Sequence, residues 1–269
     1  MNPVLRVTDV EFGYHPGKPV LRDISFEVSP GEVFIILGAN GCGKSTLMRT
    51  ILGECKPTSG RITVGGDDVA SLGVKQLAQR MAMVFQDHSA PFPFTVLDVV
   101  KMGRTPHLPP FASPTKKDNV ICLEALETVG LKDLAFEPYT QLSGGERQLV
   151  LIARALAQRT GVVLMDEPTS HLDYRNATTV ISTAHALAHE QDKAVVMITH
   201  LPDQAFYYPS CVALMRNGRF FASGPSEAVL TSENLSEVYG MDMLVLTASD
   251  ENGRRYLTCR PALSDPHGM

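Results

Sequence analysis

Apolar and polar residues alternate in the first section of the chain. The alternation is clear at Ile24, Phe26 and Val28 and again at Ile62 and Val64. Because successive side chains of a strand point to opposite faces, this period of two is typical of strands with one buried face. We therefore expect the N-terminal part of the chain to form an antiparallel sheet.

Three other runs are apolar at every position and rich in branched residues. They extend over Val33 to Leu37, Val162 to Met165 and Val195 to Ile198. Parallel strands are apolar on both faces because helices cover both sides of the sheet. We expect these runs to lie at the centre of one mainly parallel sheet, in a fold of the α/β class.

A stretch of different composition lies between the first and second of these runs. Residues 87–140 are rich in proline and include Pro91, Pro93, Pro106, Pro109, Pro110 and Pro114. Within it, a helix is predicted from Asn119 to Gly130, because Gly130 is a stop signal and apolar residues recur near one face. That face is expected to carry Val120, Leu123, Ala125, Leu126 and Val129. We interpret the stretch as a separate helical lobe.

The C-terminal part contains one clear turn signal. Two short apolar runs, Val212 to Met215 and Phe220 to Ala222, flank the pair Asn217-Gly218. An Asn-Gly pair suits a two-residue hairpin turn, because both positions need a positive φ. The stretch from Met241 onward is polar and contains glycine, and we assign it no role.

Composition excludes several classes of protein. Hydrophobic residues make up 44% and charged residues 20% of the 269 residues, unlike a disordered chain, a collagen or a coiled coil. The net charge of -5 gives no overall attraction to nucleic acid or to an anionic membrane. A role at a membrane would therefore depend on protein partners.

Membrane spans, secretion and metal-binding cysteines are not indicated. The apolar runs are far shorter than the roughly 20 residues that cross a bilayer, and the first residues lack the features of a secretory signal. No two of the 5 cysteines form a CxxC pair, which disfavours a zinc ribbon, an iron-sulfur site or a disulfide framework. We expect a cytosolic chain with reduced thiols.

A glycine-rich loop directly follows the first apolar run. Residues Gly38 to Ser45 match the pattern GxxxxGK[ST], and a helix is predicted from Ser45 to Leu52. Glycines allow backbone N–H groups to point at phosphate oxygens, and the start of the helix presents its positive end to the same charge. Lys44 is expected to contact the β- and γ-phosphates of ATP, and Ser45 to ligate Mg²⁺. The alternative is a glycine-rich turn that binds nothing.

Two carboxylates end the second apolar run. Asp166 is placed to join the magnesium shell, and Glu167 is placed to act as general base on a water aligned with the γ-phosphate. An Asp-Glu pair at a strand end can also simply face solvent. The run from Pro168 to Asp173 that follows makes the chemical interpretation the stronger one.

A second phosphate-binding element is predicted from Leu142 to Glu146. This Leu-Ser-Gly-Gly-Glu run resembles the signature sequence of ABC ATPases. It offers a serine hydroxyl and two glycines at the start of a helix. Because the first loop already encloses one triphosphate, the second element is free to close over the triphosphate of another copy. The resemblance implies a head-to-tail dimer with two enclosed ATP molecules.

The resemblance also implies roles outside these motifs. Tyr14 matches the aromatic residue that stacks on adenine, although a tyrosine in a strand also has purely structural uses. Gln86 matches the glutamine that contacts magnesium and the attacking water. Asp173 matches the aspartate of the dimer-contact loop, and His200 matches the histidine that hydrogen-bonds the γ-phosphate.

Together these assignments define an expected site. The expected catalytic residues are Glu167, His200 and Gln86, and the expected magnesium ligands are Ser45, Gln86 and Asp166. The expected ATP-binding residues are Tyr14, Gly38, Asn40, Gly41, Cys42, Gly43, Lys44, Ser45, Thr46, Ser143, Gly144, Gly145 and Asp173.

The resemblance covers nearly the whole chain and implies one ABC ATPase domain over residues 1–269. A P-loop NTPase core is expected from residues 1–86 and 161–240, with the antiparallel sheet as an N-terminal β subdomain. Residues 87–160 are expected to form an inserted α-helical subdomain that carries the signature sequence, and residues 241–269 to form a C-terminal extension without an assigned role.

Two further stretches point to a class of transporter. The stretches from Thr95 to His107 and from Leu230 to Leu235 resemble importers of iron-siderophore, haem, cobalamin and oxyanion substrates such as molybdate. This resemblance implies ATP hydrolysis coupled to uptake, at the cytoplasmic face of the cell membrane. The implied partners are a second copy of the chain, membrane-spanning permease subunits and, indirectly, a substrate-binding protein, with no nucleic acid.

Other functions remain as alternatives. The chain could instead serve another importer class or an exporter. An ABC ATPase that acts on DNA or ribosomes needs a long heptad insertion or two fused ATPase units, and neither is evident. A small-molecule kinase would have no use for the run from Leu142 to Glu146.

Several residues have two interpretations. One apolar group either docks a membrane subunit or packs the lobe's own core: Phe92, Phe94, Val96, Leu97, Val99 and Val100. Glu146 replaces the commoner glutamine of the signature, a change that we expect to be tolerated. His171 is assigned no chemistry. His185 and His189, four apart on a predicted helix, suit a metal pair less well than a solvated helix face.

Overall fold

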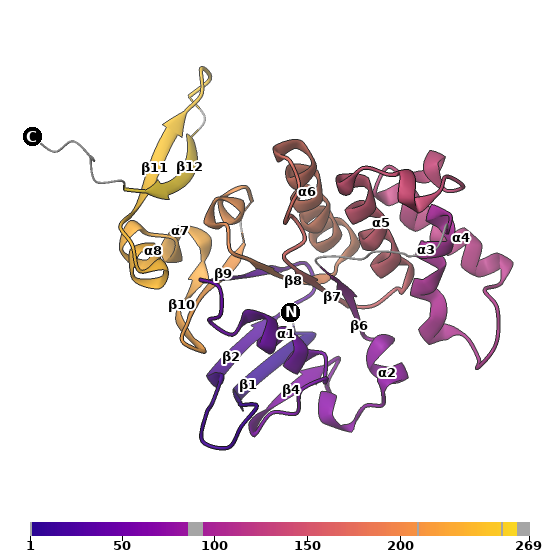
Figure 1. Cartoon of the computed structure of the whole chain (residues 1–269), viewed down its shortest axis with the longest axis horizontal. Coiled ribbons are helices and arrows are strands. Elements are labelled where there is room, and N and C mark those ends of the chain that lie inside the picture. The colour runs from indigo at the N-terminus through magenta and orange to yellow at the C-terminus, as the bar shows by residue number, and fades with distance from the viewer. Residues whose placement is uncertain (1, 86–93, 209, 254, 263–269) are drawn as a thin grey trace, which may run out of the picture.

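The N-terminal strands form a four-stranded antiparallel sheet in the order β2-β1-β4-β5, of which Figure 1 labels the first three. The structure is a computed structural model that describes residues 2–85, 94–208, 210–253 and 255–262. The four strands are β1 (Leu5–Phe12), β2 (Leu21–Val28), β4 (Ser59–Val64) and β5 (Asp67–Asp68). Ile24, Phe26 and Val28 of β2 are all buried, so the antiparallel sheet predicted from their alternation is confirmed.

The second sheet has six strands in the order β10-β9-β3-β8-β7-β6. They are β3 (Val33–Leu37), β6 (Met81–Val84), β7 (Val162–Asp166), β8 (Ala194–Thr199), β9 (Cys211–Arg216) and β10 (Arg219–Pro225). All neighbouring pairs are parallel except β9 with β10. The three continuous apolar runs form β3, β8 and β7 side by side at the centre, as predicted.

The turn between β9 and β10 needs its glycine. Asn217 and Gly218 have φ angles of 49° and 78°, the left-handed conformation expected of the predicted hairpin. A Cβ atom on Gly218 would lie 2.0 Å from the carbonyl oxygen of Val20. Close packing against the N-terminal sheet therefore excludes any larger residue at this position.

Two hydrophobic cores cover opposite faces of the central sheet. Phe34 and Ile36 of β3 pack with the antiparallel sheet and with helix α1 (Lys44–Ile51), and the Phe34 ring stacks on Phe26 with centroids 4.6 Å apart. Val33, Ile35 and Leu37 of the same strand pack with the helices on the other face. Burial of both faces explains why this strand is apolar at every position.

Helices and short 3-10 segments complete the described fold. The α-helices are α1 (Lys44–Ile51), α2 (Val74–Ala78), α3 (Val96–Lys101), α4 (Lys116–Thr128), α5 (Gly144–Ala157), α6 (Tyr174–Gln191), α7 (Ser226–Val229) and α8 (Ser232–Tyr239). The 3-10 segments are η1 (Val69–Ser71), η2 (Met102–His107), η3 (Lys132–Leu134), η4 (Tyr139–Gln141) and η5 (Pro202–Phe206). Within the described residues, no helix is both long enough and apolar enough to span a membrane.

Helices α3, α4 and α5 pack together as the lobe, to one side of the central sheet in Figure 1. A buried ion pair joins them, with Arg104 Nε 2.8 Å from Asp118 Oδ1. Arg104 Nη1 also donates to the carbonyl of Ala157 at 2.7 Å. Hydrogen bonds from Arg104 and Thr115 hold the pKa of Asp118 well below its usual range. The pair is therefore ionised at neutral pH and ties α4 and α5 to the segment after α3.

The structure decides which apolar residues of the lobe belong to its core. Val96, Leu97, Val99 and Val100 are buried in it, so their interpretation as a docking surface is wrong. Phe94 packs partly against the core, and Phe92 lies outside the described residues. The face predicted for α4 is confirmed at Ala125, Leu126 and Val129, which are buried. It is wrong at Val120, which is 55% exposed, and it lacked Ile121 and Cys122, which are buried.

The C-terminal extension forms a hairpin that the sequence analysis missed. Strands β11 (Met243–Ser249) and β12 (Arg255–Pro261) pair antiparallel and project from α8, as Figure 1 shows in yellow. The apolar run from Met243 to Leu246 was the available signal. It was overlooked because the β11 side chains, apart from Met243, are at least partly exposed, so no clean alternation marks the strand.

Candidate nucleotide-binding site

The carboxyl ends of three adjacent strands converge on one edge of the central sheet. Strand β8 lies between β3 and β7 and pairs in parallel with both. The glycine loop therefore follows β3, the acidic pair ends β7, and His200 follows β8. Ligands of open α/β sheets bind at this edge. The fold thus gathers side chains that are far apart in the sequence.

The glycine loop has the conformation of an anion-binding element. Gly43, the residue before α1, has a φ of 114° and provides no side chain to cap the helix. The first N–H groups of α1 are thus left without a side-chain cap and can receive phosphate oxygens. A Cβ atom on Gly38 would lie 2.4 Å from the carbonyl oxygen of Met215, so the loop could not pass β9 with a larger residue there.

Lys44 lies buried inside the glycine loop and bonds to its backbone. Its side chain is buried, and Nζ donates to the carbonyl oxygens of Gly38 at 2.7 Å and Ala39 at 3.2 Å. These two carbonyls accept two of the three hydrogen bonds that the ammonium group can donate. Phosphate oxygens can complete its hydrogen bonds, as expected from its place in the motif.

Tyr14 and Thr46 lie next to each other beside this loop. Their hydroxyl oxygens are 3.4 Å apart, and the Tyr14 side chain is 53% exposed. The Tyr14 ring makes an edge contact with Phe12 at a centroid distance of 5.0 Å. The Tyr14 ring is thus supported by Phe12 of the sheet while much of it stays open to a flat ligand.

The acidic pair meets His200. Glu167 Oε2 is 3.1 Å from His200 Nδ1 and accepts a hydrogen bond from Ser170 Oγ at 3.0 Å. Glu167 has a left-handed φ of 46°, and its N–H donates to the carbonyl of Ile198 in β8 at 3.0 Å. A strained backbone that is fixed by a neighbouring strand is typical of functional sites. The fold therefore brings together the two residues predicted to act on the γ-phosphate.

Asp166 has the surroundings of a cation ligand. Burial, and then the neighbouring charge of Glu167, raises the pKa of the Asp166 carboxyl above its usual value. A cation would relieve this repulsion. Within the described residues, no group of three or more His, Cys, Asp or Glu side chains forms a metal site. The oxygen donors of Asp166 and Ser45 fit Mg²⁺ that also takes phosphate oxygens from a nucleotide.

Ser143 begins helix α5 as its N-cap. Its hydroxyl donates to Glu146 Oε2 at 2.7 Å, and its backbone N–H donates to the same oxygen at 2.8 Å. Glu146 thus completes a capping box with Ser143, a role that glutamine would also perform. Ser143 and Gly144 remain exposed at the start of a 14-residue helix, where an anion would be stabilised.

The signature element packs against the loop that carries Asp173. A Cβ atom on Gly145 would lie 2.3 Å from the Asn176 side chain, so only glycine fits there. Asp173 caps α6 by accepting from the Asn176 N–H at 2.8 Å. Ser143 and Asp173, both exposed, therefore belong to one surface.

Other expected residues have less structural support. Asn40 and Gly41 lie exposed in the glycine loop, and His171 is exposed with a φ of 65°. Gln86 lies outside the described residues.

Sequence reasoning missed a buried network beside this site. Gln204 Oε1 accepts from Thr199 Oγ1 at 2.9 Å, and Gln204 Nε2 donates to Thr169 Oγ1 at 2.8 Å. Thr169 follows the acidic pair by two residues, and Thr199 precedes His200. The only sequence signal was the nearness of each threonine to a predicted catalytic residue.

Comparison with known proteins identifies the family. The family model described as ABC transporter matches residues 21–170, more than half of the chain. The chain belongs to the ABC transporter family. As a member, this ABC ATPase binds and hydrolyses ATP, as its sequence predicted.

Individual relatives extend the likeness of this ABC ATPase over almost its whole length. It is 40% identical to the hemin import ATP-binding protein of Bordetella pertussis, over 91% of this chain and 95% of the relative. It is 38% identical to a molybdate import ATP-binding protein of Haemophilus influenzae, over 90% of each chain. A solved structure of an inward-facing metal-chelate type ABC transporter matches with a TM-score of 0.87 and 35% identity, over 97% of this chain and 98% of that one.

Alkylation of Cys42 is expected to block ATP binding by this ABC ATPase. The half-buried thiol packs against the core and lies so close to the loop backbone that a Cβ atom on Gly38 would be 2.8 Å from its Sγ, so an added group would distort the loop that binds phosphate. Burial raises the pKa of the Cys42 thiol, so labelling should accelerate as the pH rises. Titration with a fluorescent nucleotide would measure the loss. The Cys42→Ser variant should bind nucleotide equally before and after treatment. Unchanged affinity after complete labelling of Cys42 would refute the prediction.

His185 is buried, so the interpretation of His185 and His189 as a solvated helix face is wrong for this residue. Its side chain is only 4% exposed, and neither ring nitrogen has a hydrogen-bond partner among the described residues. The ring stacks on Tyr208 with centroids 4.4 Å apart and lies 6.0 Å from the exposed His189. Burial, with a contribution from His189, lowers the pKa of His185 from 6.5 to about 4.

This buried histidine predicts a loss of stability in mild acid. The pKa is lower in the folded state than in the unfolded state, so the unfolded chain binds more protons between about pH 6.5 and 4. The stabilisation is complete above pH 6.5 and falls by up to ~3 kcal/mol as the pH drops through that window. Urea unfolding of the wild type and of His185→Phe at pH 7.5 and 4.5 would measure it. The variant should lose less stability, while His189→Gln, which removes only the smaller cause of the shift, should lose nearly as much as the wild type. Equal losses in all three proteins would contradict the assignment.

Proposed function

We propose that this chain is the ATP-hydrolysing subunit of an importer for a metal chelate or an oxyanion. The observation that carries the catalytic part is the 3.1 Å contact between Glu167 and His200 at the strand ends beside the glycine loop. The importer part draws on relatives named for hemin, molybdate and cobalamin import. It also agrees with the importer resemblance of residues 95–107 and 230–235.

Each residue of the proposed site has a chemical role. Lys44 and the N–H groups of residues 41–46 bind the phosphates, and Tyr14 stacks on the adenine. Glu167 accepts a proton from the water that attacks the γ-phosphate. His200 hydrogen-bonds that phosphate and, through Nδ1, restrains the Glu167 carboxylate. Bound Mg²⁺ supplies charge neutralisation of the phosphates, and Ser45, Asp166 and Gln86 are the residues proposed to hold it.

A second copy completes the site in this proposal. Ser143, Gly144 and Gly145 would bind the triphosphate held by the other copy, and Asp173 would contact that copy directly. The exposed start of α5 supports this arrangement, because it offers N–H groups and a positive dipole end to solvent. Two equivalent sites would then close in a head-to-tail dimer.

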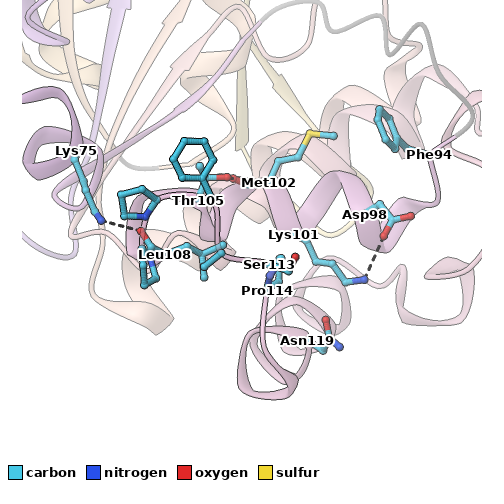
Figure 2. Close-up of a pocket in the computed structure, with 14 residues that line it drawn as sticks. Lys75, Phe94, Asp98, Lys101, Met102, Thr105, Leu108, Ser113, Pro114 and Asn119 are labelled. Carbon is cyan, nitrogen blue, oxygen red and sulfur yellow. Dashed lines mark hydrogen bonds and ion pairs between the residues drawn. The ribbon is translucent and has the colours of Figure 1, made fainter.

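Membrane-spanning permease subunits are the proposed partners of the lobe, and a substrate-binding protein acts through them. Figure 2 shows the surface that we assign to them, a cavity of 790 Å³ beside α3 and η2. Its lining includes Phe94, Met102 and Phe111, and the last two are exposed. Exposed apolar side chains around a hollow are typical of protein interfaces. The chain would then be peripheral, at the cytoplasmic face of the membrane.

Reconstituted transport tests this proposal. The chain would be co-purified with the permease subunits encoded beside it and inserted into vesicles that contain the binding protein. We expect ATP-dependent uptake of one cargo among haem, a ferric siderophore, cobalamin and molybdate, and no uptake with Lys44→Ala. Export of a substrate, or ATP hydrolysis without uptake of any of these cargoes, would overturn the importer assignment.

A further inference from the structure

The turn that carries His200 is not part of a strand ladder. Strand β8 pairs with β3 only as far as Thr199, and the chain then bends toward η5. The imidazole nevertheless has to meet both Glu167 and the γ-phosphate. Contacts from other parts of the fold must therefore hold this turn in place.

One contact comes from the end of α8. The hydroxyl of Tyr239 donates to the backbone carbonyl of His200 at 3.1 Å, across 39 residues of sequence. The Tyr239 ring packs against the core that contains the lobe and the central sheet. Burial raises the pKa of the Tyr239 phenol, so the hydroxyl stays protonated and can donate at any physiological pH.

A second contact comes from the C-terminal hairpin. Asp203 in η5 accepts hydrogen bonds at Oδ1 from the Cys259 N–H at 2.8 Å and from Thr258 Oγ1 at 2.9 Å, both in β12. The hairpin is itself joined to α8, because the Val245 N–H donates to Ser232 Oγ at 2.8 Å. Hydrogen bonds from α8 and from the hairpin therefore hold the two ends of the segment 200–203.

The opposite side of the same segment is also fixed. The buried Gln204 side chain links Thr199 to Thr169, as described above. This link ties the turn to the chain that follows Glu167. Without the hydrogen bond from Tyr239, the peptide plane that contains the His200 carbonyl could rotate. This rotation would move the His200 imidazole away from Glu167. A displacement of about 1 Å in a catalytic group lowers turnover substantially.

We propose that Tyr239, supported by the hairpin contact to Asp203, is a positioning residue that holds His200 in its catalytic place. This gives Thr258 and Cys259 of the C-terminal hairpin a part in ATP hydrolysis that the sequence did not suggest. The proposal rests on the role proposed for His200 above. Tyr239 touches neither Glu167 nor the nucleotide in this scheme, and it acts only through the backbone of His200.

The Tyr239→Phe variant tests the proposal with the loss of one oxygen atom. We expect kcat for ATP hydrolysis to fall about three- to tenfold, the effect of one hydrogen bond, with the KM for ATP within twofold of the wild type. The melting temperature should change little because the ring still packs in the core. Tyr256→Phe is the matched control, since the Tyr256 hydroxyl bonds to Asp250 within the hairpin, and its kcat should equal that of the wild type.

A double-mutant cycle separates positioning from general destabilisation. In a His200→Ala background, measured by single-turnover hydrolysis, Tyr239→Phe should cause no further loss, because no imidazole remains to be positioned. Asp203→Ala should behave in the same way, with a lower kcat in the wild type and no effect in the His200→Ala background. An equal loss in both backgrounds, or a normal kcat in Tyr239→Phe, would overturn the proposal.

The same measurements distinguish the proposed role of His200 from the proposed positioning role of Tyr239. Full turnover in His200→Ala alone would refute the proposed role of His200, and with it the positioning role. A large loss in His200→Ala combined with a silent Tyr239→Phe would refute only the positioning role.

Discussion

The Glu167→Gln variant is expected to hydrolyse ATP at least about a hundredfold more slowly than the wild type while binding ATP normally. Glutamine keeps the size and hydrogen bonding of glutamate but cannot accept the proton of the attacking water. The contacts of the Glu167 carboxylate with Ser170 Oγ and His200 Nδ1 can be kept by the amide oxygen. Phosphate release under single-turnover conditions would measure the rate, and nucleotide titration the affinity.

A stable ATP-loaded dimer should accumulate in this variant because the bridging nucleotide is no longer consumed. Size-exclusion chromatography with ATP and Mg²⁺ would detect it. Glu190→Gln, the same change on the exposed end of α6, should leave both turnover and elution unchanged. Near-normal turnover in Glu167→Gln would assign the general base to another residue.

The Ser143→Arg variant is expected to bind ATP as a monomer but to lose ATP-dependent dimerisation, and with it about a hundredfold or more of the turnover. Arginine would fill the space that the proposed dimer reserves for the other copy's triphosphate. It would also remove the N-cap of α5, at a cost of about 1 kcal/mol. Sedimentation velocity with and without ATP, in the Glu167→Gln background, would measure the dimer.

Thr115→Arg provides the matched control for the lost cap. Thr115 is the N-cap of α4 in the same lobe and forms the same kind of capping box, with Asp118. This variant should lose a similar amount of stability and still form the ATP-dependent dimer. If Ser143→Arg also dimerised with ATP, the signature element would not be part of the shared site.

The strands of the central sheet were predictable because their pattern is local and strong. Val33 to Leu37 had to be covered on both faces, and the structure covers them with two separate cores. The Asn217-Gly218 turn was predictable because few residues adopt its two positive φ angles. Helix α4 shows the limit of such patterns, since its apolar residues predicted the burial of Ala125, Leu126 and Val129 but placed Val120 on the buried face in place of Ile121 and Cys122.

The elements of the nucleotide site were visible for a related reason. The glycine loop, the acidic pair and the signature run are each contiguous, so the backbone alone places their functional groups close together. The chemistry that we propose for them could therefore be predicted before any fold was known. Glu146 is a smaller example, because its spacing from Ser143 already matches a capping box.

What the sequence determined by itself is therefore the family and the class of fold, and it also predicted the chemistry of each local motif. Only the tertiary structure decided which distant residues meet: Glu167 with His200, Tyr239 with the His200 carbonyl, Asp203 with the C-terminal hairpin, and His185 with Tyr208. Local patterns indicate which hydrogen bonds the backbone of a segment makes within its own helix or turn and which face of the segment is buried. Contacts between segments depend on how the sheets and helices stack, and a single short motif contains no record of that stacking.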